Sequence, residues 1–152
     1  MINKYDGIKF TGCFSREQVR DFYPVFAEIP CSLISITDPY SSPPEINGKW
    51  ADVLCLTFWD TIDGDSALVS TFPPVNPEQI KEMYDFIVAH KSHHIYAHCE
   101  AGISRSGAIV EFLNRRGWTV DVRTRILRNP NILVLNGLNR LDRKHTIFWT
   151  TE

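Results

Sequence analysis

Long hydrophobic runs are missing from this chain of 152 residues. No apolar stretch approaches the roughly 20 residues that span a bilayer. Residues 1–6 also lack the apolar core of a secretory signal peptide. The sequence therefore predicts a protein of the cytoplasm that has no membrane partner.

An excess of basic charge is also missing. Sixteen Lys and Arg stand against eighteen Asp and Glu, which gives a formal net charge of −2. Such a chain has no extended positive field, so nucleic acid is not expected as a partner. Any anion must then be bound by a local group of residues.

Cysteine is scarce, and its spacing argues against C-x-x-C motifs and against a framework of disulfides. The four cysteines are Cys13, Cys31, Cys55 and Cys99, and no two form a C-x-x-C pair. A chain of this length needs no disulfides to be stable, so reduced thiols are expected, with the first three as small core residues. Whether one of them pairs with Cys99 on oxidation stays open.

A metal site is not predicted either. His93, His94, His98 and Cys99 are close in sequence, but alternation along a strand sends His94 and His98 to one face and His93 to the other. We therefore expect no metal and no cofactor.

What the sequence does contain is typical of one globular domain over residues 1–152, here assumed to be monomeric. Hydrophobic residues make up 43% of the chain, there is no internal repeat, and the turn-rich stretch 38–48 is a surface loop. Short apolar runs predict buried strands at 31–36, 52–58 and 94–98.

Helical patterns alternate with these strands. Asn76-Pro77 followed by Gln79 is a helix start, and apolar residues at helical spacing continue to Ile87. Further helices are predicted at 105–116, stopping at Gly117, at 121–128 and at 131–143. The expected fold is α/β, with a central, mostly parallel sheet of about four or five strands flanked by helices, and a helical C-terminal third. Ligands of such sheets bind beyond the carboxyl ends of the strands.

The segment from 98 to 107, His-Cys-Glu-Ala-Gly-Ile-Ser-Arg-Ser-Gly, lies at such a strand end. Cys99 faces the start of a predicted helix, where unpaired N–H groups and partial positive charge bind anions and favour a thiolate. Gly102 lets the loop curl, and the guanidinium of Arg105 can grip two phosphate oxygens. The predicted phosphate-binding residues are Glu100, Ala101, Gly102, Ile103, Ser104 and Arg105.

The segment from 98 to 106 resembles the signature loop of the protein tyrosine and dual-specificity phosphatases, since it reads His98-Cys99, five further residues and then Arg105-Ser106. The short chain is most similar to the compact dual-specificity group. The resemblance implies that group's fold and a two-step reaction in which the Cys99 thiolate forms a phosphocysteine that water then hydrolyses. It also implies that Arg105 holds the phosphate, Ser106 eases the departure of Cys99, and His98 supports the thiolate. No metal is required.

The family also places a general acid, an aspartate, on a loop before the cysteine. Asp60 is our first choice because it follows Phe58-Trp59 at the end of a predicted strand, and Asp63 is the second. Asp65 is better explained as part of a turn. The stretch lacks the Trp-Pro-Asp sequence of classical tyrosine phosphatases, so location decides the choice.

The resemblance implies a protein phosphatase whose partner is a phosphotyrosine-containing protein or peptide, and action on phosphoserine and phosphothreonine stays open. Glu100 argues against inositol lipids, because phosphatases of such substrates typically carry basic residues in this loop. Tyr40, Trp59 and Phe72 are candidates to line the cleft. Two alternatives are a phosphoprotein-binding module without catalysis and an RNA 5′-triphosphatase-like phosphatase.

Overall fold

A five-stranded parallel sheet forms the centre of the computed structural model, which describes residues 7–22, 29–46, 49–62, 70–124 and 129–149. Every strand pair is parallel, and the strand order is β3-β2-β4-β1-β5. The predicted α/β class is therefore confirmed. The strands are β1 (Phe10–Phe14), β2 (Cys31–Thr37), β3 (Asp52–Thr57), β4 (His94–His98) and β5 (Thr119–Val120).

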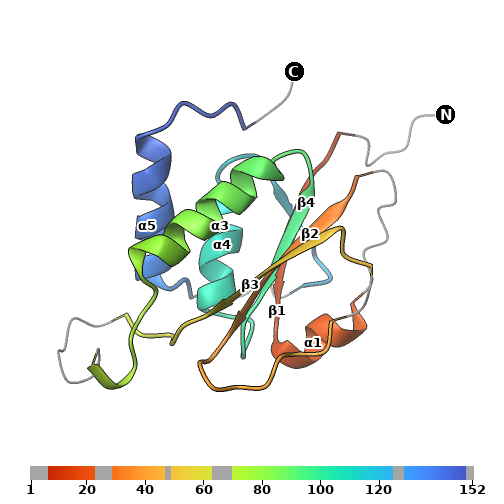
Figure 1. Cartoon of the computed structure of the whole chain (residues 1–152). Helices are drawn as coiled ribbons and strands as arrows, with labels where there is room; N and C mark the ends of the chain where they lie inside the picture. The colour runs from red at the N-terminus through yellow and green to blue at the C-terminus, as the bar shows by residue number, and fades with distance from the viewer. Residues whose placement is uncertain (1–6, 23–28, 47–48, 63–69, 125–128, 150–152) are drawn as a thin grey trace.

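Helices cover both faces of the sheet. Figure 1 shows helices on both sides of the sheet, with α1 on the side away from the others. In the described parts of the chain they include α1 (Arg16–Asp21), α3 (Pro77–Ala89), α4 (Arg105–Asn114) and α5 (Ile132–Arg143). Each face of the sheet thus has its own core, as expected for parallel strands buried on both sides.

The two cores differ in composition. On the side of α3, α4 and α5, aliphatic side chains such as Ile36 and Ile95 pack against Ile109 and Leu138. The side of α1 is mainly aromatic and includes Phe14, Trp50 and Tyr96. Neighbours along β4 alternate between the two, so this strand is held from both faces.

Several predictions need correction. Strands β1 and β5 and helix α1 were not predicted, and α4 ends at Asn114 rather than at residue 116. Gly117 has the expected left-handed conformation, with φ of 111°. Cys55 is exposed rather than part of the core, because its strand β3 lies at the edge of the sheet.

The helix predicted at 121–128 is also wrong where the structure describes it. Residues 121–124 form a turn, and 125–128 lie outside the described residues. The Asp121 carboxylate accepts a hydrogen bond from the backbone N–H of Arg123, and its carbonyl accepts one from the N–H of Thr124. Short-range bonds of this kind compete with helix formation.

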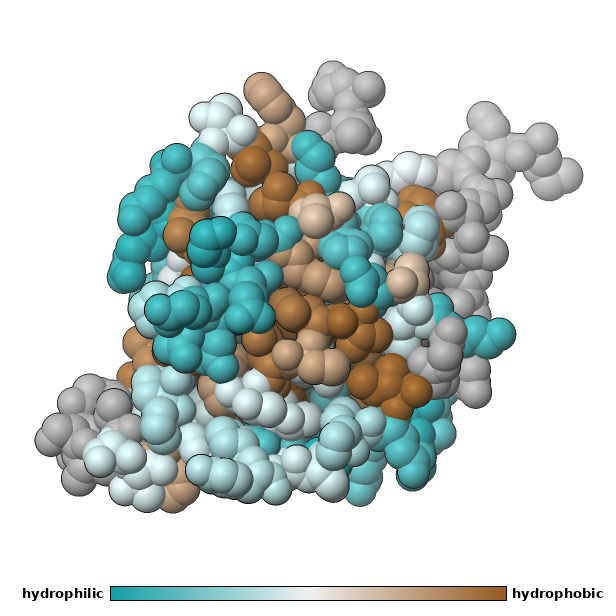
Figure 2. Space-filling model, viewed as in Figure 1, coloured by the Kyte–Doolittle hydropathy of each residue, from teal (hydrophilic) through white to brown (hydrophobic). Residues whose placement is uncertain are grey.

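The carboxyl ends of β1, β2, β3 and β4 meet at one edge of the sheet, since all four run parallel. On the face seen in Figure 1, hydrophobic side chains lie in the middle and hydrophilic ones border them (Figure 2). Within the described ranges, no helix combines the length and apolar character needed to cross a membrane.

Candidate active site

Cys99 directly follows β4 at this edge. Its backbone N–H donates to the carbonyl of Phe14 at the end of β1, at 3.3 Å. The side chain is only 2% exposed, and its Sγ lies 3.1 Å from Oγ of Ser106, on the first turn of α4. The thiol is therefore held between a strand end and a helix start.

The loop after Cys99 curls tightly because of Gly102. This glycine has φ of 72°, and a Cβ placed on it would overlap the backbone of Phe14 and Ser15. Only a residue without a side chain fits there without strain. Around it, Ala101 is exposed, while Ile103 and Ser104 are half-buried.

Arg105 is the first residue of α4, and its side chain is almost fully buried. Nη1 donates to the Asp38 carboxylate and to the carbonyl of Phe58, each at 2.7 Å. Nε is buried and has no hydrogen-bond partner among the described residues. A buried donor without a partner is costly, so an anion bound at this atom would be stabilising.

The N-terminus of α4 carries no side-chain cap, because Ser104 makes no hydrogen bond to the helix backbone. Its Oγ instead donates to Oδ1 of Asp60 at 2.8 Å. The first backbone N–H groups of the helix are therefore left without a side-chain acceptor, and they carry the positive end of the helix dipole.

Asp60 lies beyond the end of β3, close to the loop. Its Oδ1 accepts hydrogen bonds from Ser104 Oγ and from Nδ2 of Asn131, both at 2.8 Å. The residue itself is exposed. Asp63, the second candidate for the acid, and Asp65 lie outside the described residues.

Glu100 points to neighbouring segments. One of its carboxylate oxygens lies 3.5 Å from Nη1 of Arg16 and accepts a 3.4 Å bond from the backbone N–H of Asp38. Its carbonyl accepts a bond from the N–H of Arg16. This acidic side chain thus ties the loop to the ends of β1 and β2.

His98 is fully buried beside the cysteine, and its Nε2 lies 2.6 Å from Oγ of Ser35. Burial lowers the pKa of His98 to about 4, and the nearby cations of Arg16 and Arg105 lower it too. The imidazole is consequently neutral at neutral pH.

A cavity of about 290 Å³ lies beside the site. Pro39 and Tyr40 line it from the loop after β2, and Phe58 and Trp59 from the residues after β3. Phe72 is not part of the lining but packs edge-on against Trp59, with ring centroids 5.2 Å apart. Tyr40 is fully exposed and has φ of 70°.

Sequence reasoning missed three residues of this site: Arg16, Asp38 and Asn131. Asp38 follows the carboxyl end of β2, so its place after a predicted strand was a usable signal. Asn131 was taken as part of a helix, whereas it is the N-cap of α5, a position that asparagine favours. Arg16 belongs to a helix that was not predicted.

No group of three or more His, Cys, Asp or Glu residues that could hold a metal ion occurs in the described parts of the chain. The donors present, a guanidinium and backbone N–H groups around a thiol, instead suit an anion with several oxygen atoms.

Comparisons with known proteins add little. No protein-family model matches the chain, and no curated protein matches it in sequence. Among solved structures, it is similar to a human tyrosine phosphatase-like serine/threonine/tyrosine-interacting protein, with a TM-score of 0.47 and 18% identity, covering 76% of this chain and 78% of that one.

Proposed function

We propose that this protein is a cysteine-dependent phosphatase that hydrolyses phosphotyrosine in proteins or peptides. One observation carries the proposal: a buried thiol, an uncapped helix start and the Nε of Arg105, which has no partner among the described residues, come together at the end of β4. Thiolate and phosphate are both stabilised by such an environment.

In the first step, the phosphate group lies in the loop of residues 100–105 and is held by backbone N–H groups and Arg105. The Sγ of Cys99 attacks phosphorus, and the bond from phosphorus to the tyrosine oxygen breaks. In the second step, water attacks phosphorus, the S–P bond breaks and inorganic phosphate leaves. Ser106, whose Oγ is 3.1 Å from Sγ, stabilises the departing thiolate. Fixed donors of this kind supply most of the stabilisation of a charged transition state.

Asp60 is the proposed general acid. It donates a proton to the leaving oxygen in the first step and takes one from water in the second. Because Oδ1 already accepts bonds from Ser104 and Asn131, the transferred proton belongs on Oδ2. The same two bonds fix the direction of the carboxyl group.

The aromatic cavity supports phosphotyrosine as the substrate. Tyr40 and Trp59 line it, and Phe58 connects it to Arg105 through its carbonyl. A phosphotyrosine side chain, with its phosphate in the loop, could pack its ring against these aromatic side chains. A phosphoserine side chain is shorter and has no ring to place there.

The test is turnover of p-nitrophenyl phosphate and of a phosphotyrosine peptide by the wild type and Cys99→Ser. We expect the wild type to turn over both, the variant to lose all measurable turnover, and mass spectrometry of acid-quenched wild type to show a phosphate adduct on Cys99. Cys55→Ser, which changes an exposed thiol on β3, is the matched control and should keep full activity. Turnover by Cys99→Ser would contradict the proposal.

A second candidate function is binding of phosphoproteins without turnover. The observation in its favour is that Asp60 is already engaged by two donors. On this hypothesis the wild type binds a phosphotyrosine peptide with the same affinity as Cys99→Ser but hydrolyses neither peptide nor p-nitrophenyl phosphate. Measurable wild-type turnover that depends on Cys99 excludes it.

A further inference from the structure

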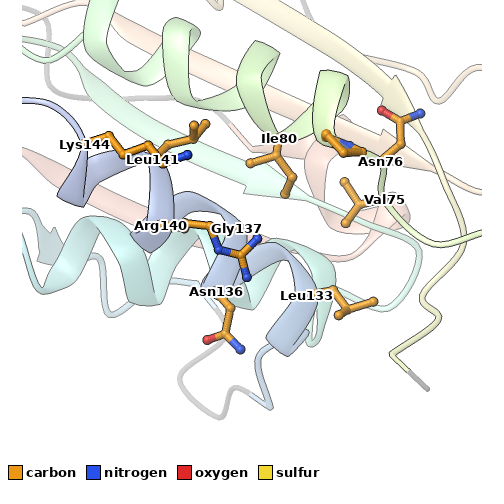
Figure 3. A pocket seen from close by; sticks show the side chains of 10 residues that line it. Val75, Asn76, Ile80, Leu133, Asn136, Gly137, Arg140, Leu141 and Lys144 are labelled. Atoms are coloured by element: carbon orange, nitrogen blue, oxygen red, sulfur yellow. The ribbon is translucent and has the colours of Figure 1, made fainter. Parts of the chain in front are cut away.

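A second recess lies between α3 and α5, away from the thiol. Its volume is about 370 Å³, and residues of both helices line it. In Figure 3, Ile80 points from α3 toward α5, and Arg140 lies on α5 across from it. We call this recess the α3–α5 groove.

The groove combines an apolar surface with positive charge. Val75, Ile80, Leu133 and Leu141 supply apolar side chains. Gly137 keeps the two helices close and adds no bulk, since a Cβ there would lie only 2.8 Å from Cδ1 of Ile80. Figure 3 shows the space between the two helices at this point.

Two cations border this surface. Arg140 and Lys144 are both exposed, and their side chains form no hydrogen bond or ion pair with any described residue. No aspartate or glutamate is among the described residues that line the groove. By contrast, Arg116, just beyond the end of α4, is held by Asp142 and Asn139. The groove is thus locally positive, although the whole chain has a net charge of −2.

The length of the groove favours a peptide. Its lining runs along α5 from Leu133 to Lys144, which at 1.5 Å per residue is roughly 16 Å. An extended chain covers that distance with about five residues. A recess also suits inserted side chains, whereas a membrane-binding surface presents protruding apolar side chains.

We infer that the α3–α5 groove binds a short segment of a partner protein that combines aliphatic side chains with aspartate or glutamate. The aliphatic side chains fill the space between Ile80, Leu133 and Leu141, and the carboxylates pair with Arg140 and Lys144. Because binding is the readout, the inference does not depend on the proposed hydrolase activity.

The groove is also linked to the candidate active site. Asn131, the N-cap of α5, donates to Asp60, and Gln79 on α3 donates to the carbonyl of Thr57 at the end of β3. A partner bound between the two helices therefore lies on elements that contact the strand end carrying Asp60.

The test starts with selection of a random peptide library, displayed on phage, against the full wild-type chain. We expect enriched sequences with acidic residues next to leucine, isoleucine or valine. Synthetic copies of the selected peptides, added to the isotope-labelled protein, should shift the NMR amide signals of α3 and α5. Failure to enrich any peptide, or shifts confined to other elements, would overturn the inference.

Charge reversal provides the sharper measurement. The double variant Arg140→Glu with Lys144→Glu should weaken binding of the selected peptide at least tenfold, and it should bind a copy in which lysine replaces each acidic residue. Arg143→Glu changes an exposed cation of the same helix that does not line the groove, so its affinity should stay within twofold of the wild type.

Three results would contradict the assignment. The first is equal loss of affinity in Arg143→Glu and in the double variant, which would indicate general charge attraction. The second is sedimentation of the wild type with phosphatidylserine vesicles without peptide binding, which would identify a membrane surface. The third is self-association of the wild type through α3 and α5, measured by analytical ultracentrifugation, which would identify a second copy as the occupant.

Discussion

Two helices of this protein begin in opposite ways. Helix α3 starts with a complete capping box, in which Asn76 accepts from the N–H of Gln79 and Gln79 accepts from the N–H of Asn76. Helix α4 has Ser104 at its N-cap position, and the Ser104 side chain makes no such bond. The backbone donors of α3 are therefore used for stability, whereas those of α4 remain available for a ligand.

The charges at the starts of α3 and α4 show the same contrast between stability and ligand binding. Glu78 lies in the first turn of α3, where a negative charge is favoured by the helix dipole. The first turn of α4 has no acidic residue, and its first residue is the cation Arg105. A guanidinium at the positive end of a helix is unfavourable by itself, and Asp38 offsets it only in part. On the proposed function, a bound phosphate would supply the missing negative charge, and the start of α4 would trade stability for anion binding.

Among changes that test the contrast between the two helix starts, the largest effect is expected from Arg105→Lys, which removes the planar donor set at the start of α4. We expect kcat for p-nitrophenyl phosphate to fall about 10²- to 10³-fold, as for loss of a preorganised donor. Lysine cannot bond Asp38, Phe58 and a phosphate in the same geometry. Tungstate should raise the Tm of the wild type and leave that of the variant unchanged.

Arg115→Lys is the matched control, because Arg115 is the exposed C-cap at the other end of α4. It should keep both turnover and the tungstate response. If Arg105→Lys retains wild-type kcat, Arg105 is only a structural partner of Asp38, and the contrast between the two helix starts has no functional meaning.

The second prediction compares two glycines in the left-handed region. Gly102→Ala should lower the free energy of unfolding by about 3 kcal/mol, because strain at positive φ is combined with overlap on the β1 backbone. Gly7→Ala has a similar φ of 79° but open space around its Cβ, so its cost should be about 1 kcal/mol. Urea denaturation measures both, and equal costs would mean that the loop does not press on β1 as described.

The third prediction concerns pH. The pKa of His98 is lowered to about 4 by burial, whereas an unfolded histidine has its ordinary value of about 6.5. Between these values the unfolded chain binds a proton that the folded chain does not. The contribution of neutral His98 to the free energy of unfolding is thus fully present above about pH 6.5. As the pH falls from 6.5 toward 4, the free energy of unfolding decreases by up to about 1.4 kcal/mol per pH unit.

His98→Gln should remove this contribution and flatten the decline in unfolding free energy between pH 6.5 and 5. Some decline should remain, because burial also lowers the pKa of His94 to about 4. His145→Gln, at an exposed position after α5, is the control for the replacement of a histidine by glutamine. An unchanged slope in His98→Gln would show that its imidazole is protonated alike in both states.

The difference between the starts of α3 and α4 also shows which features could be predicted from the sequence. The start of α3 was predicted correctly because a capping box and Pro77 are local signals. Strand β1 was not predicted because Gly12 weakens the β-strand pattern of the sequence. A glycine is needed at this position because Thr124 lies where a Cβ of residue 12 would point. Long-range packing of this kind is invisible in a local pattern.

At the candidate site, the sequence placed Cys99 and Arg105 on one loop because a short motif contains both. The partners that orient them come from other segments: Asp38 from the end of β2 and Asn131 from the start of α5. Helix α1 was overlooked although Ser15 and Gln18 form a capping box three residues apart. That signal was local and could have been used, whereas the pairing of Asp38 with Arg105 required the sheet order.

The smallest effect is expected from removing single polar groups at the two helix starts. Asn76→Ala should lower the free energy of unfolding by about 1 kcal/mol, the usual cost of losing an N-cap. It should change turnover of p-nitrophenyl phosphate less than Ser104→Ala does, although Asn76 also lines the cavity beside the site. Ser104→Ala should change stability by less than about 0.5 kcal/mol, because no cap is lost. It should lower turnover several-fold instead, since Asp60 loses one of its two donors. The opposite pattern, with stability lost in Ser104→Ala and turnover lost in Asn76→Ala, would show that the missing cap of α4 has no connection with anion binding.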